Sequence, residues 1–170
     1  IADPELAQTF KDGSFATVYL SPRDYHRVHM PAAGTLLRTI HIPGKLYSVS
    51  LKTAGQIPTL FAENERYVSV FDTEYGKMIV ILVGAINVSS METVWAGEIT
   101  PPYGKVLAYQ NYEDGMTLEK GAEMGRFNMG STAIVLLEKN DRVALNPELK
   151  EAAPVQMGGA LYNLCNLSQD

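Results

Sequence analysis

Cysteine, long apolar runs and excess positive charge are all scarce in this chain of 170 residues. Its one cysteine, Cys165, cannot close an intramolecular disulfide, and no Cys/His cluster has the spacing of a metal site, so no metal is expected. The longest uncharged apolar run, Met78–Met91, is shorter than the about 20 residues that a membrane-spanning helix needs. The net charge of -5 argues against nucleic acid as a partner.

The remaining composition is that of an ordinary globular protein, with 46% hydrophobic and 19% charged residues. No internal repeat, low-complexity tract or flexible linker divides the sequence, so we expect residues 1–170 to form a single domain. The chain starts at Ile1 without an initiator methionine or an apolar leader, which favours a processed or truncated product over a secretory precursor.

Short segments rich in β-branched and aromatic residues are the dominant structural signal, and they predict strands. The second and third of these segments flank the turn-like sequence Asp72–Gly76, so they should form a hairpin. Prolines punctuate the gaps between the segments, where no ladder hydrogen bond is required of them. The predicted strands are Phe15–Leu20, Tyr67–Phe71, Met78–Val83, Val106–Tyr109 and Thr132–Leu137.

Two short helices are predicted where a capping side chain precedes a proline and an acidic residue, at Asp3-Pro4-Glu5 and at Asn146-Pro147-Glu148. The first should end near Asp12-Gly13, with Gly13 in the left-handed conformation. Together with the strands, these signals predict an α+β, β-rich fold, in which antiparallel sheets pack as a sandwich or a partly open barrel with short peripheral helices.

Histidines are few, and two of them lie close together in the segment YHRVHMP as His26 and His29. Spacing alone favours surface or capping histidines, because a metal site would need a third ligand and none is nearby. The imidazole pKa of about 6.5 leaves a role in acid–base chemistry open. The isolated His41 is expected at the surface, and the polar cluster Glu63–Arg66 is expected to be a solvated turn.

The segment GAEMGRFNMGST, residues 121–132, leads into the last predicted strand. A glycine before a serine at a strand entrance is usually a turn. A serine hydroxyl can also attack the carbonyl of the preceding residue if the backbone is held tightly, and a preceding glycine leaves that approach open. The resulting ester could eliminate and hydrolyse to a pyruvoyl group, which would give the chain an electrophilic ketone at Ser131 without a bound cofactor.

Six blocks of the sequence, in order and spacing, resemble the phosphatidylserine decarboxylase family, and the bacterial and mitochondrial type is the more similar. The blocks are spread between about Gly13 and Leu137, which is most of the chain. They are Ser21–Pro31 (SPRDYHRVHMP), Ile42–Val49 (IPGKLYSV), Leu60–Arg66 (LFAENER), Phe71–Gly76 (FDTEYG), Val83–Gly97 (VGAINVSSMETVWAG) and Lys120–Thr132 (KGAEMGRFNMGST).

The resemblance implies a proenzyme that cuts itself between Gly130 and Ser131, giving a larger chain that ends at residue 130 and a smaller one that begins at residue 131. Ser131 would become the pyruvoyl cofactor, which forms a Schiff base with the amine of phosphatidylserine and accepts the electrons released with carbon dioxide. His29 matches the family base for self-cleavage, and His26 the histidine of substrate handling and decarboxylation. The product would be phosphatidylethanolamine.

The resemblance also implies a peripheral membrane enzyme, a homodimer of processed heterodimers, on the cytoplasmic face of a bacterial inner membrane or on the mitochondrial inner membrane. The family's membrane-docking region and the Asp of its self-cleavage triad would precede Ile1. Two alternatives stay open: a pyruvoyl decarboxylase of another amino-acid substrate, and a non-catalytic lipid-binding homologue.

Overall fold

The computed structural model describes residues 1–86, 90–99 and 107–165. Two antiparallel sheets dominate the described part, and a small hairpin accompanies them. The helices are α1 (Pro4–Thr9), α2 (Leu51–Ala54) and α3 (Leu60–Glu63). The strands are β1 (Ser14–Tyr19), β2 (Arg27–His29), β3 (Gly34–Ile42), β4 (Arg66–Thr73), β5 (Gly76–Val83), β6 (Met91–Thr93), β7 (Gly97–Glu98), β8 (Ala108–Leu118), β9 (Glu123–Phe127), β10 (Thr132–Leu137), β11 (Val143–Leu145) and β12 (Tyr162–Leu164).

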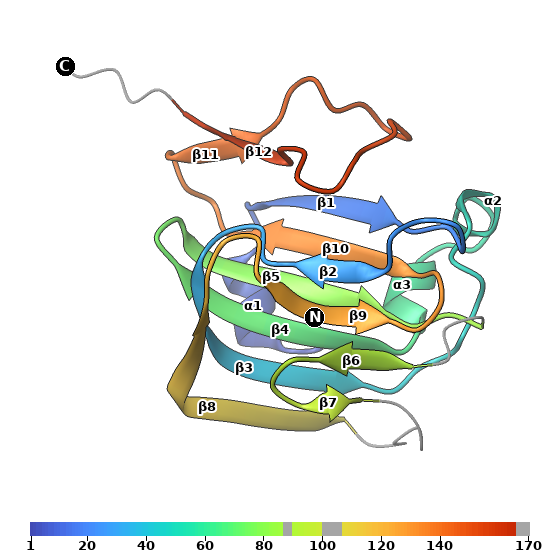
Figure 1. Cartoon of the computed structure of the whole chain (residues 1–170), viewed down its shortest axis with the longest axis horizontal. Helices are drawn as coiled ribbons and strands as arrows, with labels where there is room; N and C mark the ends of the chain where they lie inside the picture. Colours follow the sequence, from blue (N-terminus) through green and yellow to red (C-terminus); the bar gives the residue numbers. More distant parts are fainter. Residues whose placement is uncertain (87–89, 100–106, 166–170) are drawn as a thin grey trace.

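The larger sheet has six strands in the order β1-β10-β5-β4-β3-β8, and the smaller has four in the order β2-β9-β6-β7. Figure 1 shows the small sheet lying over one face of the large sheet, with the β11–β12 hairpin beyond β1. Both sheets contribute to one hydrophobic core, in which Met124 and Met91 of the small sheet join Phe71 and Ile79 of the large one. The β-rich sandwich predicted from the sequence is therefore confirmed.

The central strands are buried on both faces, since β4 and β5 lie inside the large sheet between the small sheet and the α1 side. The β-branched and aliphatic run of β5 from Met78 to Val83 is buried at every position. A strand with only one buried face would instead alternate with polar residues. The predicted β4–β5 hairpin is confirmed, and it closes at a turn whose last residue, Gly76, has a φ of 96°.

The first predicted helix is confirmed as α1, and its start is fixed by the expected cap. The Asp3 carboxylate accepts a hydrogen bond from the backbone N–H of Leu6 at 3.0 Å and also pairs with Arg38 at 2.9 Å. The helix ends earlier than predicted, at Thr9, and Gly13 has no positive φ. Glycine is needed at position 13 for another reason, because a Cβ there would collide with the carbonyl oxygen of Leu137.

The second predicted helix is wrong. Asn146 does cap locally, because its side chain accepts a hydrogen bond from the N–H of Glu148, but residues 147–148 form only a turn. No apolar stripe follows to bury a helix face, and a cap alone does not offset the cost of nucleation. The strand predicted at Val106–Tyr109 corresponds to β8, which begins at Ala108; Val106 lies outside the described residues.

Two substitutions of Asp3 distinguish the contribution of the helix cap to stability from that of the ion pair with Arg38. We expect Asp3→Ala to lower the free energy of unfolding by about 1–2 kcal/mol, because an alanine cap costs about 0.5–2 kcal/mol and the partly buried guanidinium also loses its partner. Asp3→Asn keeps a side-chain acceptor for Leu6 and should cost clearly less. Urea denaturation of the full-length protein measures both, and equal losses would show that the cap contributes nothing.

No helix in the described part of the chain is long and apolar enough to span a membrane.

Candidate functional site

The Gly130–Ser131 bond lies inside the molecule, where the chain leaves the small sheet and enters the large one. Ser131 is fully buried, and it directly precedes β10, which is paired with β1 on one side and β5 on the other. Its carbonyl oxygen accepts a hydrogen bond from the N–H of Leu20 at 2.7 Å, and its hydroxyl donates to the carbonyl oxygen of Val83. The candidate nucleophile is thus held by β-sheet contacts on both sides and is shielded from solvent.

Gly130 has room for no side chain. A Cβ at this position would lie 2.9 Å from the carbonyl oxygen of Leu20, 3.0 Å from the nitrogen of Pro22 and 3.1 Å from the carbonyl carbon of Ser21. These atoms belong to the backbone of residues 20–22, directly after β1. They could not move away without breaking the pairing of the chain at the end of β1. The glycine therefore lets residues 20–22 press directly against the peptide that carries the candidate cleavage bond.

A cavity of about 30 Å³ adjoins Gly130, which is room for roughly one water molecule. It is formed where the ends of β1 and β5 meet the loop after β3. Ile86 at its border is 69% exposed, so this end of the sandwich reaches the surface. The lining residues are Tyr19, Leu20, Pro22, Ser48, Val49, Ser50, Ala85, Ile86 and Gly130.

His26 lies near this cavity, just before β2. Its Nε2 is 3.4 Å from the carbonyl oxygen of Pro22, the residue whose nitrogen closes in on Gly130. Its Nδ1 is buried and has no hydrogen-bond partner among the described residues. A buried imidazole nitrogen without a partner is costly unless another group fills the place. The Nδ1 of His26 is therefore available for a hydrogen bond to a further group.

His29 lies on β2 and is held by two hydrogen bonds. Its Nδ1 is 2.7 Å from the carbonyl oxygen of Gly121, and its Nε2 is 2.8 Å from the hydroxyl of Tyr25, whose ring stacks on the imidazole. Since a carbonyl oxygen can only accept, the Nδ1 of His29 carries the proton in this arrangement. In the neutral imidazole Nε2 is then the unprotonated nitrogen, and the phenol of Tyr25 donates to it.

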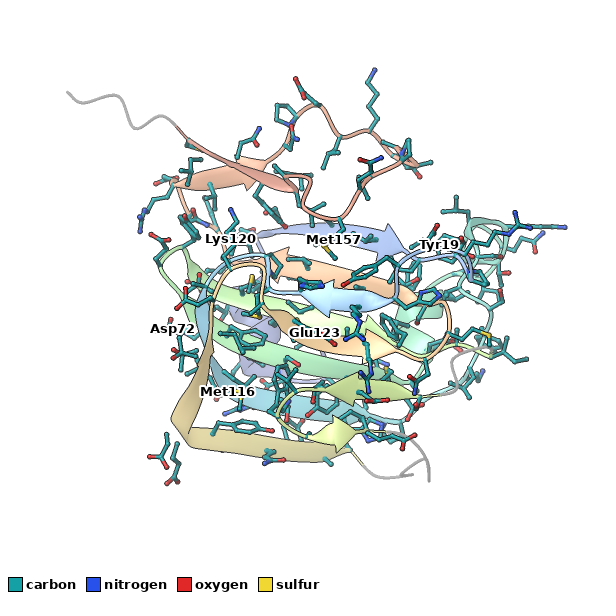
Figure 2. All side chains as sticks on the ribbon, viewed as in Figure 1. Tyr19, Asp72, Met116, Lys120, Glu123 and Met157 are labelled. Atoms are coloured by element: carbon teal, nitrogen blue, oxygen red, sulfur yellow. The ribbon has the colours of Figure 1, made fainter. Side chains whose placement is uncertain are left out.

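The two histidines lie beside opposite ends of β9. His29 pairs with Glu123 at the start of β9, whereas the carbonyl of His26 bonds Phe127 at its end. At about 3.3 Å per residue, this separates the two ends by about 13 Å. In Figure 2, Glu123 is labelled to the left of Tyr19, which lines the cavity beside Gly130. The structure thus brings His26 toward the bond, and no hydrogen bond between described residues joins His29 to Ser131.

Polar side chains on the small sheet fix the segment that leads to Gly130. Asn128 donates to Glu92 at 3.1 Å and also to the hydroxyl of Ser90, and its backbone N–H bonds the carbonyl of Ser90. The hydrogen bond from Arg126, helped by that from Asn128, lowers the pKa of the Glu92 carboxyl. Beside it, the hydrogen bond to Glu123 raises the pKa of the exposed Arg27 guanidinium. The contacts of Arg126 and Asn128 join the β9 side to β6 just before the chain enters the site, and the Arg27–Glu123 pair joins β2 to β9.

Two sequence-based expectations about polar residues are wrong. Asn64 and Glu65 lie in the presumed solvated turn but are 0% and 2% exposed. His41 is not a free surface residue, because its side chain is only 15% exposed and its Nε2 lies 2.7 Å from the Glu65 carboxylate. The position of this polar cluster directly before a buried strand was the one sequence signal for its burial. The hydrogen-bond partners that offset the cost of burying these side chains exist only in the folded chain.

Among the described residues, no group of three or more His, Cys, Asp or Glu side chains could hold a metal ion. The groups that the structure places at or near the Gly130–Ser131 bond are one buried hydroxyl, the preceding glycine carbonyl and the imidazole of His26.

Comparison with known proteins gives a family match over nearly the whole sequence. Residues 1–163 match the family described as phosphatidylserine decarboxylase. A phosphatidylserine decarboxylase proenzyme of Alkalilimnicola ehrlichii is 61% identical over 144 residues, covering 84% of this chain and 49% of the relative. Proenzymes of the same name from Pseudomonas aeruginosa and Xylella fastidiosa are 56% and 50% identical, covering 94% and 99% of this chain and 56% and 57% of those relatives. The chain thus spans about half the length of the curated relatives it matches.

Proposed function

Because the chain belongs to the phosphatidylserine decarboxylase family, we propose that it carries the self-cleaving and catalytic part of an enzyme that converts phosphatidylserine to phosphatidylethanolamine. The observation that carries the proposal is the buried Gly130–Ser131 bond, with its hydroxyl oriented and its glycine pressed against residues 20–22. An ordinary turn at a strand entrance would need neither feature.

The proposed cleavage uses atoms of this chain and one water molecule. The Ser131 hydroxyl oxygen attacks the carbonyl carbon of Gly130, the peptide C–N bond breaks, and an ester with a free amine at residue 131 results. Loss of the Cα proton of residue 131 then expels the Gly130 carboxylate and leaves an unsaturated residue. Water hydrolyses its imine tautomer, so that ammonia leaves and a ketone remains at the new N-terminus.

The residues around Ser131 suit the pyruvoyl group that this sequence of steps would produce. Gly130, which precedes Ser131, lines a water-sized cavity together with Pro22, and the carbonyl oxygen of Pro22 lies 3.4 Å from the Nε2 of His26. The pyruvoyl group would supply an electron sink, through a Schiff base with the substrate amine, for the electrons released with carbon dioxide. The tasks left to the chain are to hold the headgroup, to exclude water and to move protons.

The histidine roles are proposed from the family resemblance, with His29 as base for cleavage and His26 in substrate handling and decarboxylation. The unpartnered, buried Nδ1 of His26 supports its role, because a headgroup atom or a reacting proton would satisfy it. The bonds of His29 support basicity at its Nε2, but this nitrogen must exchange Tyr25 for the Ser131 hydroxyl before it can act. Action as a homodimer on the cytoplasmic face of a membrane belongs to the same proposal.

Intact-mass spectrometry of the full-length protein tests the cleavage. We expect two polypeptides divided between Gly130 and Ser131, the shorter one with a blocked N-terminus. Borohydride should add a hydride and a proton to the shorter polypeptide alone, since it reduces a ketone. A fully active protein with an unbroken chain, or an unblocked serine at residue 131, would contradict the proposal.

Release of carbon dioxide from phosphatidylserine vesicles, compared with free serine, tests the substrate. We expect turnover of the lipid only. Equal rates on both, or activity confined to free serine, would reject the lipid assignment, and a cleaved protein without any turnover would favour a binding role.

A further inference from the structure

Asn64 is completely buried and makes hydrogen bonds to two separate segments near the site. Its side-chain oxygen accepts from the N–H of Tyr47 at 3.0 Å, and its amide nitrogen donates to the carbonyls of Tyr47 and Gly84, each at 2.9 Å. Such a set uses both amide protons and one acceptor site of the side chain. Asn64 thereby ties the loop after β3 to the residue that follows β5.

Glu65, the residue after Asn64, holds the same segment through its backbone. The N–H of Gly84 donates to the carbonyl oxygen of Glu65 at 2.8 Å. This N–H belongs to the same planar peptide unit as the carbonyl of Val83, so a hydrogen bond to one sets the direction of the other. The Val83 carbonyl is the acceptor of the Ser131 hydroxyl. Fixing this peptide therefore fixes the nucleophile.

From these contacts we infer that Asn64 is a positioning residue for self-cleavage, which holds the Val83–Gly84 segment so that the Ser131 hydroxyl faces the Gly130 carbonyl. Asn64 itself touches no reacting atom. The Asn64 amide fixes the carbonyl of Gly84, and the Glu65 backbone fixes the peptide before it, so the segment is held on both sides of Gly84. The inference rests on the proposed function, because it assigns Asn64 to a step of that reaction.

Asn64→Asp is the sharpest test, because it keeps the size of the side chain but replaces the donating amide by an acceptor. A carboxylate oxygen would then face the carbonyl oxygens of Tyr47 and Gly84, which repel it. We expect cleavage of the full-length precursor to slow by about 10–100-fold, since small misplacements of a reacting group cost about that much. The measurement is the rate at which precursor divides after refolding, relative to the unsubstituted protein at the same pH.

The pH dependence of this ratio separates positioning from general damage. Burial beside two carbonyls raises the pKa of the introduced carboxyl, and its protonated form can donate one hydrogen bond again. We therefore expect the rate of Asn64→Asp, relative to the unsubstituted protein, to recover as the pH is lowered. Asn64→Ala has no group that titrates, so its relative rate should stay low across the same range.

Two further variants keep the test decisive if Asn64→Asp folds poorly. Val70→Ala destabilises β4 on the face toward α1, away from Ser131, and should cleave normally when compared at an equal folded fraction. Gly84→Ala leaves Asn64 intact but places a Cβ 3.3 Å from a methyl carbon of Leu46 and 3.4 Å from the carbonyl oxygen of Glu65. It should shift the same peptide slightly and slow cleavage.

The outcomes distinguish this inference from the proposed function. If the unsubstituted protein divides at Gly130–Ser131 while Asn64→Asp divides equally fast, or slows no more than Val70→Ala and without recovery at low pH, the inference is overturned and the proposed function stands. If the unsubstituted protein never divides, both fail.

Discussion

The full-length Ser131→Ala protein is expected to remain one continuous polypeptide with no detectable decarboxylase activity. Alanine removes the oxygen that would attack Gly130, and no other described hydroxyl bonds the Val83 carbonyl in its place. Without cleavage no ketone forms, so both the division of the chain and the turnover should be lost together, by at least about 10³-fold given the usual size of nucleophile effects. Intact mass and carbon dioxide release measure the two losses.

Ser69→Ala is the matched control for this prediction. Ser69 is also a fully buried serine in the large sheet, but it lies within β4 and its hydroxyl has no hydrogen-bond partner in the described part of the chain. Removing that hydroxyl should leave division and turnover unchanged and should not destabilise the fold. Division of Ser131→Ala at Gly130 would show that the reaction does not depend on the Ser131 oxygen. Loss of division in Ser69→Ala would show that the effect of removing a buried hydroxyl is not specific to Ser131.

A strand could be predicted from the sequence where one continuous segment is apolar and rich in β-branched residues. Met78–Val83 and Thr132–Leu137 are almost entirely apolar and rich in β-branched residues, because both lie inside the large sheet and need no polar face. β3 was missed, since Arg38, Thr39 and His41 interrupt its apolar pattern and find polar partners only after folding. The strands of the small sheet other than β9 have three residues or fewer, too few to show alternation.

The sequence motif of the candidate site could be predicted, but the spatial arrangement of its residues could not. Gly130 and Ser131 follow from the resemblance, but the reason for the glycine, its contact with residues 20–22, depends on a pairing between distant parts of the chain. The burial of Asn64 could not be inferred, because its partners are backbone groups of Tyr47 and Gly84 that any sequence would provide. Polar composition alone indicates solvent exposure.

Replacing each histidine by glutamine is expected to separate cleavage from turnover. His29→Gln should leave the precursor undivided, because an amide cannot accept the Ser131 proton, whereas His26→Gln should divide and then lose about 10²–10⁴-fold in turnover, the usual contribution of a proton-transferring group. Mass spectrometry of each protein, followed by carbon dioxide release from phosphatidylserine vesicles, gives both results. His41→Gln is the matched control, since glutamine can still donate to Glu65 and His41 lies on β3, outside the proposed reaction.

The geometry makes the opposite outcome equally informative. His26 and Gly130 both contact Pro22, while His29 is bonded to Gly121 and Tyr25 at the other end of β9. Cleavage in His29→Gln together with an undivided His26→Gln would reverse the two roles and assign the base to the imidazole nearer the bond. If the roles hold as proposed, the Nε2 of His29 must leave Tyr25 before cleavage. Tyr25→Phe, which removes the competing phenol, should then divide at least as fast as the unsubstituted precursor.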